Sequence, residues 1–183
     1  TNSFEMIIDK KEDLEGLPDS AIEAYAMEAD KKKYSGKWLV TLHAPSYIPF
    51  MQYAKNRELR KKLWTAFNSR AFEGEFSNQE IILKMIKLKH ERALLLGYKT
   101  FAEYTLEERM AENSNKVFEF LNKLHAASNQ AAKNDLNEVK EFRKKLEGSN
   151  DEFMPWDFAY FSEKLKEEKY AFNEEELRPY FKL

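Results

Sequence analysis

The chain has 183 residues, of which 43% are hydrophobic and 34% charged, and its formal net charge is −2. Because the positive and negative charges nearly cancel, the sequence does not predict the concentrated basic surface that nucleic-acid binding requires. The sequence contains no cysteine, which excludes disulfides, thiolate metal sites and a cysteine nucleophile. It also has no apolar run near the ~20 residues that a membrane-spanning helix needs.

With only five glycines and five prolines, the composition favours helices over a turn-rich β protein. We predict a mainly α fold in which residues 1–183 form a single bundle-like helical domain. Residues 4–8 (FEMII) and 37–43 (KWLVTLH) have the apolar and alternating patterns of strands. We expect them to pair as a small two-stranded ribbon, since a lone strand would leave its backbone groups unsatisfied.

Helices are expected in the remainder of the first seventy residues. Pro18 suits the first turn of a helix that ends at Ser35–Gly36. Ser46 predicts the start of a short helix through residue 54, and Asn56 predicts the start of the next helix. That next helix has an inward face at helical spacing, formed by Leu59, Leu63, Ala66, Phe67 and Ala71.

Residues 77–111 predict two helices joined by a turn at Gly97. Ser77 with Glu80, and Thr100 with Glu103, each have the spacing of a capping box. The first of these helices carries a broad apolar stripe, which we expect to be buried as the central packing surface of the fold. The stripe consists of Ile81, Ile82, Met85, Leu88 and Leu95.

The last third predicts a long amphipathic helix from Asn113 or Ser114 to about Glu147, ended by Gly148. Its apolar stripe consists of Val117, Leu121, Leu124, Ala131, Leu136, Val139, Phe142 and Leu146. Another helix begins with Pro155 in its first turn and Asp157 near its positive end. Asn173 and Glu176 predict the start of a last helix.

The three histidines are His43, His90 and His125. His90 and Glu91 begin a sequence like the zinc motif H-E-x-x-H, but Leu94 stands where the second histidine belongs. We therefore interpret His90–Glu91 as a surface pair, His43 as a turn or core residue, and His125 as a partly buried helix residue. The sequence predicts no catalytic, cofactor-binding or metal-ligating residue in this chain.

Aromatic side chains gather at Trp156, Phe158, Tyr160 and Phe161. They could line a peptide-binding groove or form part of the core. Large aromatic side chains are more often buried than displayed, so the core interpretation is preferred.

Several stretches together resemble the thimet-oligopeptidase family of zinc metallopeptidases. These are DLEGLPDSAI, KWLVTLHAPSYIPFMQYAKNRELRKKLWTAFNSRA, ALLLGYKTFAEYTLEERMA, MPWDFAYFSEKL and EEELRPYFKL. They occur in the family's order and cover nearly the whole chain. Within the family, KWLVTLH with QYAKNRELR, and the ending PWD…EKLKEEKY…LRPYF, look most like bacterial peptidyl-dipeptidase.

The resemblance implies a mostly helical, two-lobed enzyme that cleaves short peptides with a zinc ion held by H-E-x-x-H and a further glutamate. It places that motif downstream of LRPYF, so no ligand or catalytic residue is carried over to this chain. The first residue is Thr and the last residues run apolar to the end, which predicts a fragment of a longer protein.

We therefore predict a non-catalytic helical segment of a peptidyl-dipeptidase-like peptidase, inactive alone and located in the cytoplasm. The expected partners are the remainder of the peptidase and, through it, short peptides. Self-association of the fragment is a further prediction, whereas nucleic acid and membranes are not expected. The alternative function is a self-sufficient helical module that binds a protein or peptide.

Overall fold

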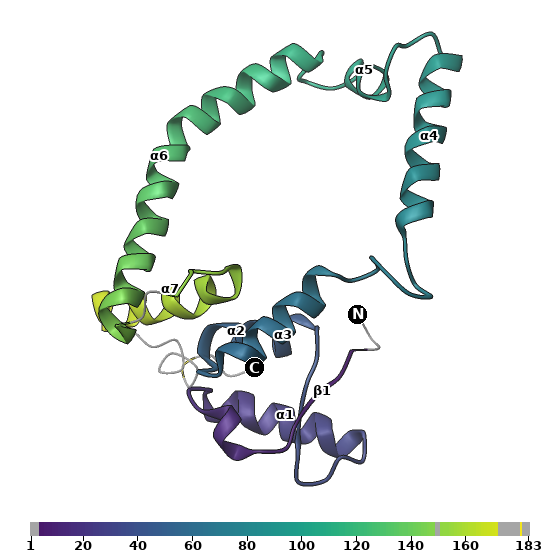
Figure 1. Ribbon diagram of the computed structural model, residues 1–183. Helices are drawn as coiled ribbons and strands as arrows, with labels where there is room; N and C mark the ends of the chain where they lie inside the picture. The colour runs from purple at the N-terminus through teal and green to yellow at the C-terminus, as the bar shows by residue number, and fades with distance from the viewer. Residues whose placement is uncertain (1–3, 149–150, 172–179, 181–183) are drawn as a thin grey trace. The chain divides into compact units, whose positions relative to one another are not determined.

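The computed structural model describes residues 4–148, 151–171 and 180. Seven helices and a small antiparallel sheet are present in this described part, which confirms the mainly α fold class. The elements in chain order are β1 (Met6–Ile8), the 3-10 turn η1 (Lys11–Leu14), α1 (Asp19–Lys31), β2 (Trp38–Val40), α2 (Ala44–Tyr53), α3 (Arg57–Asn68), α4 (Gln79–Leu95), α5 (Phe101–Leu106), α6 (Ser114–Glu147) and α7 (Pro155–Tyr170) (Figure 1).

The chain forms two compact units. Unit 1 consists of Thr1–Arg70 with Asn137–Leu183, and unit 2 consists of Ala71–Leu136. The last turns of α6, from residue 137 onward, thus belong to unit 1 together with α7. Among the described residues, no helix combines the length and the apolar character needed to span a membrane.

The sheet of unit 1 confirms the predicted ribbon, with strands shorter than the predicted ranges. β1 and β2 are antiparallel, and Met6 lies opposite Val40. Met6, Ile8 and Val40 are buried, and α1 packs against β2. Apolar side chains on the paired strands therefore contribute directly to the core.

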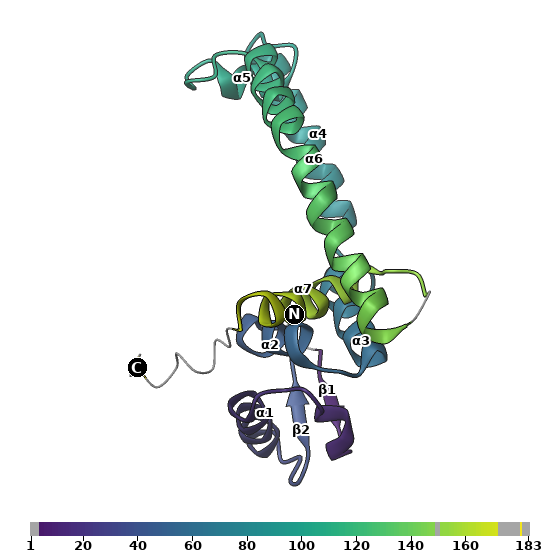
Figure 2. The ribbon, with the colours of Figure 1, turned by 90° about the vertical axis from the view of Figure 1, so that its left-hand side faces the viewer.

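Three helices of unit 1, α2, α3 and α7, pack on one another (Figure 2). Asn56 caps α3 as predicted, because its side-chain oxygen accepts a hydrogen bond from the backbone N–H of Leu59 at 3.2 Å. The main core combines side chains from the sheet, α1, α2, α3 and α7. Its buried members are Met6, Ile8, Leu14, Leu17, Ala21, Tyr25, Val40, Leu42, Phe50, Met51, Tyr53, Ala54, Leu63 and Trp156.

The loop before α1 depends on Gly16. Its φ is +91°, a left-handed conformation that favours glycine, and an added Cβ would clash with the backbone carbonyl of Tyr53. The neighbouring Glu15 carbonyl accepts a hydrogen bond from the Lys55 N–H at 2.9 Å. The loop can therefore lie directly against the end of α2 only because residue 16 has no side chain.

The start of α2 differs from the prediction. The helix begins at Ala44 rather than at Ser46, and His43 occupies the cap position without a side-chain hydrogen bond. The Ser46 hydroxyl instead accepts a hydrogen bond from the Thr41 N–H at 2.9 Å. Ser46 thus holds the chain after β2 against the first turn of α2.

Unit 2 contains α4, α5 and most of α6. Thr100 caps α5 as predicted, with its hydroxyl oxygen accepting from the Glu103 N–H at 3.1 Å. The capping box predicted at Ser77 and Glu80 is displaced, because α4 begins at Gln79 with Asn78 in the cap position. The Ser77 hydroxyl accepts from the Gln79 N–H at 3.4 Å and donates to the Phe72 carbonyl at 3.0 Å. The left-handed Gly97 at φ +86° follows α4 as predicted.

The predicted burial of the α4 stripe is wrong in this chain. Its five members are exposed by half or more: Ile81, Ile82, Met85, Leu88 and Leu95. Ala93 is the one buried residue within residues 71–136, all of which are described. The short helix α5 packs against α4 but is too small to cover it, so α4 is not the central packing helix of this chain.

Helix α6 runs from Ser114 to Glu147 as predicted, and Asn113 caps it by accepting from the Lys116 N–H at 3.0 Å. Its apolar stripe is only partly buried. Val139 and Phe142, in unit 1, pack with α7 residues Tyr160 and Phe161 in a second core cluster. The remaining predicted members do not reach full burial, and Leu121, Leu124 and Leu146 are about half exposed.

Helix α7 begins at Pro155 as predicted. The predicted start at Asn173 and Glu176 lies outside the described residues.

Truncating a leucine to alanine is expected to change the free energy of unfolding by different amounts in the two units. Leu63→Ala removes a fully buried side chain of unit 1 and is expected to lower the free energy of unfolding by about 2–5 kcal/mol. Leu83→Ala, at a position that is 67% exposed in unit 2, is expected to change it by less than about 0.5 kcal/mol. Urea unfolding followed by far-UV circular dichroism measures both variants, because it reports the helices of both units, and tryptophan fluorescence reports unit 1 alone, where all three tryptophans (Trp38, Trp64 and Trp156) lie. Equal losses in both variants would contradict the assignment of the core.

Candidate functional site

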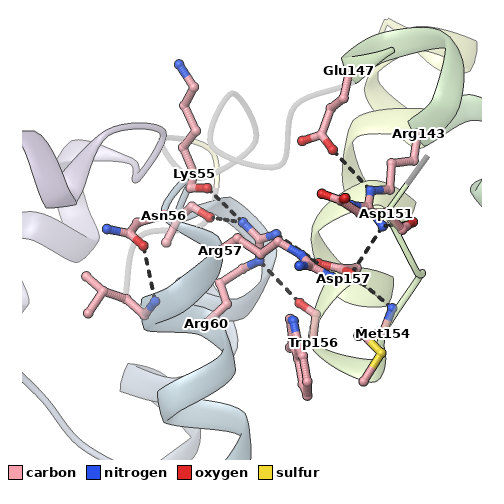
Figure 3. A network of polar contacts seen from close by, with 12 residues as sticks. Lys55, Asn56, Arg57, Arg60, Arg143, Glu147, Asp151, Met154, Trp156 and Asp157 are labelled. Carbon is pink, nitrogen blue, oxygen red and sulfur yellow. Dashed lines mark hydrogen bonds and ion pairs between the residues drawn. The ribbon is translucent and has the colours of Figure 1, made fainter. Parts of the chain in front are cut away.

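The most developed polar site among the described residues is a network around Asp157 in unit 1 (Figure 3). Its carboxylate has no solvent exposure. Arg57 donates to both carboxylate oxygens, from Nε at 2.9 Å and from Nη2 at 2.8 Å. Arg60 donates at 3.3 Å and Arg143 at 3.5 Å. One carboxylate thus joins α3, α6 and α7.

The position of Asp157 within α7 explains why it faces this network. The residue lies in the first helical turn, and its second oxygen accepts a hydrogen bond from the Met154 N–H at 3.0 Å. A carboxylate at this position satisfies an unpaired backbone donor and meets the positive end of the helix. Asp157 is therefore held by its own helix before any arginine reaches it.

Arg60 is also buried, with 1% of its surface exposed. Besides Asp157, its guanidinium donates to the carbonyl oxygens of Ala54 (2.8 Å), Lys55 (3.0 Å) and Trp156 (3.2 Å). Its carbon Cζ also lies 4.2 Å from the centre of the Tyr160 ring, within cation–π range. Arg60 thereby satisfies carbonyls at the end of α2 and at the start of α7.

Arg143 of α6 likewise combines a contact to Asp157 with hydrogen bonds to backbone carbonyls. It is 3% exposed, and its Nε donates to Glu147 at 3.0 Å. Its Nη1 donates to the carbonyl oxygens of Asp151 and Glu152 at 3.3 and 3.1 Å. Asp151 and Glu152, just before α7, are therefore held by the same guanidinium that contacts Asp157.

The network shifts the protonation equilibria of its members. Burial by itself raises the pKa of Asp157, but hydrogen bonds from Arg57 and Met154 and the charges of Arg57 and Arg143 outweigh it, so that pKa is lowered. Burial lowers the pKa of Arg60 despite the opposing effect of Asp157. The hydrogen bond to Asp157 raises the pKa of Arg57. The lowered pKa of Asp157 and the raised pKa of Arg57 both favour the charged forms that pair with each other.

Chemically, this network is suited to holding helices together and unsuited to catalysis. Both oxygens of Asp157 are occupied by donors from the protein, and the carboxylate has no contact with solvent. A general acid or base has to reach a substrate proton. Asp157 is thus a structural carboxylate.

The three histidines are not brought together. His43 precedes α2 in unit 1, whereas His90 lies in α4 and His125 in α6. All three are exposed, so the predictions that His43 is a turn residue and His90 a surface residue agree with the structure, and the predicted partial burial of His125 is wrong. No group of three His, Asp or Glu side chains that could hold a metal occurs in residues 4–148, 151–171 and 180.

The aromatic cluster of α7 is part of the core. Trp156, Tyr160 and Phe161 are at least nine-tenths buried, and only Phe158 is largely exposed. Trp156 packs edge-on against Trp64, with ring centres 5.7 Å apart. These three rings are therefore not displayed for binding a peptide.

A shallow groove of about 550 Å³ lies between α1 and α2. Pro18, Ala21, Pro45, Ile48 and Tyr53 are among its lining residues. The groove contains no charged side chain. Its polar lining side chains are those of Ser20, Gln52 and Tyr53, and a specific ligand site would use a few such groups to fix the orientation of its ligand.

Sequence reasoning identified Asp157 as a helix-start residue but missed its three arginine partners. A usable signal was present. Arg60 lies three residues before the buried Leu63, and Arg143 directly follows Phe142 on the apolar stripe of α6. An arginine on an apolar helix face needs a buried partner of opposite charge.

The known proteins whose sequences are similar to this chain are peptidases. Residues 50–183 match the model of peptidase family M3. The chain is 44% identical over 190 residues to the probable cytosolic oligopeptidase A of Arabidopsis thaliana, covering 100% of this chain and 27% of that protein. It is 36% identical over 186 residues to oligopeptidase A of Escherichia coli, covering 99% of this chain and 27% of that protein.

The chain belongs to peptidase family M3, which confirms the resemblance seen in the sequence. It spans about a quarter of the length of these relatives. The dipeptidyl carboxypeptidase of Escherichia coli also matches, at 26% identity over 179 residues, 97% of this chain and 26% of that protein. Relatives named oligopeptidase A and relatives named dipeptidyl carboxypeptidase therefore both match this chain.

Removing the central carboxylate is expected to be costly. Asp157→Asn leaves three arginines around an uncharged group and should lower the free energy of unfolding at pH 7 by about 3–5 kcal/mol. Because the folded pKa of Asp157 is lowered, its contribution is fully present above the unfolded pKa of about 3.9 and is lost as the pH falls through the folded pKa. Urea unfolding at pH 7 and below pH 4 should show the variant and the unaltered chain converging in acid.

The matched control is Glu28→Gln. Glu28 is a 41% exposed carboxylate that pairs with Lys31 at 3.0 Å on the surface of α1. Its loss should change the free energy of unfolding by less than about 0.5 kcal/mol. If the two variants were equally stable at pH 7, the central role of Asp157 would be refuted.

Proposed function

We propose that this chain is a non-catalytic helical segment of an oligopeptidase A-like peptidase, and that the metal-binding and catalytic residues of the complete enzyme lie outside residues 1–183. The observation that carries the proposal is the match of essentially the whole chain to one quarter of oligopeptidases of known class. The described residues offer no metal-ligating group, and the sequence places Leu94 where H-E-x-x-H requires histidine.

The role of the segment follows from what it contains. Unit 1 has its own core and a buried ion network that fixes α3 and α7 to the end of α6. Catalytic groups have to be held in place by rigid elements around them. Unit 1 is suited to be such a rigid support within the complete enzyme.

The complete enzyme is proposed to cleave short peptides, as the name oligopeptidase indicates for the relatives, and to act in the cytoplasm. The location rests on the name of the Arabidopsis relative, which is called cytosolic. Its partners in this proposal are the peptide substrates and the rest of the same polypeptide.

The isolated chain of 183 residues is expected to have no peptidase activity and no tightly bound zinc. Cleavage of a fluorogenic peptide of about ten residues, with and without added zinc, measures the activity, and elemental analysis after dialysis measures bound metal. Oligopeptidase A of Escherichia coli serves as the positive control on the same peptide. Zinc-dependent cleavage by the isolated chain would refute the proposal.

For the complete enzyme, the higher identity to the oligopeptidase A relatives predicts cleavage at internal bonds of a short peptide. Mass spectrometry of the products from a peptide whose C terminus is amidated separates the two modes of cleavage. Internal fragments are expected. Cleavage restricted to release of C-terminal dipeptides from the same peptide with a free carboxylate would instead favour the dipeptidyl carboxypeptidase branch.

A further inference from the structure

Helix α4 carries an apolar face that the rest of unit 2 leaves at least half exposed. This α4 apolar face consists of Ile81, Ile82, Met85 and Ile86, each of which is at least half exposed. Successive helical residues are separated by about 100°, so these four positions lie on one side of the helix. The side chains form a continuous apolar surface over about two turns.

The charged residues of α4 lie on the opposite side of the helix. Glu80, Lys84, Lys87 and Glu91 recur at spacings of three and four residues and form a charged strip. The Nζ atom of Lys87 lies 3.9 Å from the carboxylate of Glu91, and the two side chains are 78% and 51% exposed. Leu83 and Leu94 lie beside this strip and are also exposed, so the α4 apolar face is distinguished by having no charged residue among its four members.

Part of the C-terminal half of α4 is in contact with α5. Ala93 is fully buried, and α5 packs against α4. Arg92 donates to the Tyr104 hydroxyl at 3.0 Å, and the Nζ atom of Lys89 lies 5.2 Å from the centre of the Phe101 ring. Leu88 and Leu95 stay exposed beside this contact. The four members of the α4 apolar face, in the N-terminal half, have no such contact with α5 and are all at least half exposed.

We propose that the α4 apolar face is a docking surface for the part of the same peptidase polypeptide outside residues 1–183. This inference rests on the proposed function, and the occupant is argued from length. The relatives match this chain from end to end and have about three quarters of their residues outside the match. Burying isoleucine and methionine side chains stabilises by roughly 1.5–3 kcal/mol each, so four of them at one place favour a permanent cover within one polypeptide.

Cysteine labelling tests the cover directly, because the 183 residues contain no cysteine. Met85→Cys places a thiol in the α4 apolar face, where the present side chain is 50% exposed. Lys87→Cys is the matched control, since two residues along a helix lead to the opposite side. Each variant is made in the isolated chain and in the full-length product of the gene that encodes it. The rate of alkylation at that site is read by mass spectrometry of its peptide.

In the isolated chain at low concentration, both thiols should be alkylated at similar rates. In the full-length protein, labelling at residue 85 should slow by more than tenfold relative to labelling at residue 87. Equal rates at the two sites in the full-length protein would overturn the proposal, and so would an encoding frame that holds no residues beyond these. Protection of residue 85 in the isolated chain that grows with concentration, with no added protection in the full-length protein, would assign the face to a second copy instead.

The readout is burial and not catalysis. Peptidase activity of the same full-length protein is measured separately, so a protected residue 85 in an inactive protein would refute the proposed function and leave the docking surface standing. Ile82→Cys, on the same face, repeats the test at a second position. If Met85→Cys prevents folding, the labelling rate at Ile82→Cys tests whether the α4 apolar face is covered.

Discussion

The structure of unit 1 depends on one buried negative charge. Asp157 has no contact with water, and moving an unpaired carboxylate into such a place would cost several kcal/mol. The cost is offset because Arg57 and Arg60 of α3 and Arg143 of α6 surround it, while the Met154 N–H binds it from its own helix. Each arginine also donates to backbone carbonyls. Arg60 donates to those of Ala54 and Trp156, and Arg57 and Arg143 both donate to that of Glu152. The arrangement ties α3, α6 and α7 to one carboxylate, so loss of that carboxylate leaves buried arginines without their partner.

Unit 2 is built on a different balance. Its helices have good local signals, including the Thr100 cap, the Asn113 cap and the left-handed Gly97. Local signals of this kind contribute about 1 kcal/mol each, whereas most helix stability in proteins comes from packing an apolar face. Unit 2 has Ala93 as its one buried residue, so its helices are specified by sequence but supported by little burial of their own.

This difference explains where sequence reasoning succeeded. Helix positions for α3, α5, α6 and α7 and the pairing of the small ribbon follow from periodicity and capping, because these depend on residues close together in the chain. At Ser77 the error is one of position, because α4 begins at Gln79 and Ser77 accepts only from the N–H of that first residue. At Ser46 the hydroxyl oxygen accepts from the Thr41 N–H, and α2 begins two residues earlier, at Ala44. A capping pattern shows which side chains can cap a helix and does not show which other groups they meet.

Burial was harder to predict than secondary structure, because burial depends on what else is present. The stripe of α4 and the stripe at Leu63 of α3 have equivalent apolar patterns in the sequence, yet Leu63 is fully buried and Ile81 is 56% exposed. The Asp157 network shows the converse case, in which charged residues are fully buried because partners nearly a hundred positions apart converge on them. An apolar stripe predicts that a helix packs against a partner, but it does not identify the segment that provides the partner. The burial around Asp157 depends only on residues of this chain. The exposed apolar side chains of α4 instead indicate that the sequence of this helix is suited to a neighbour that the chain itself does not supply.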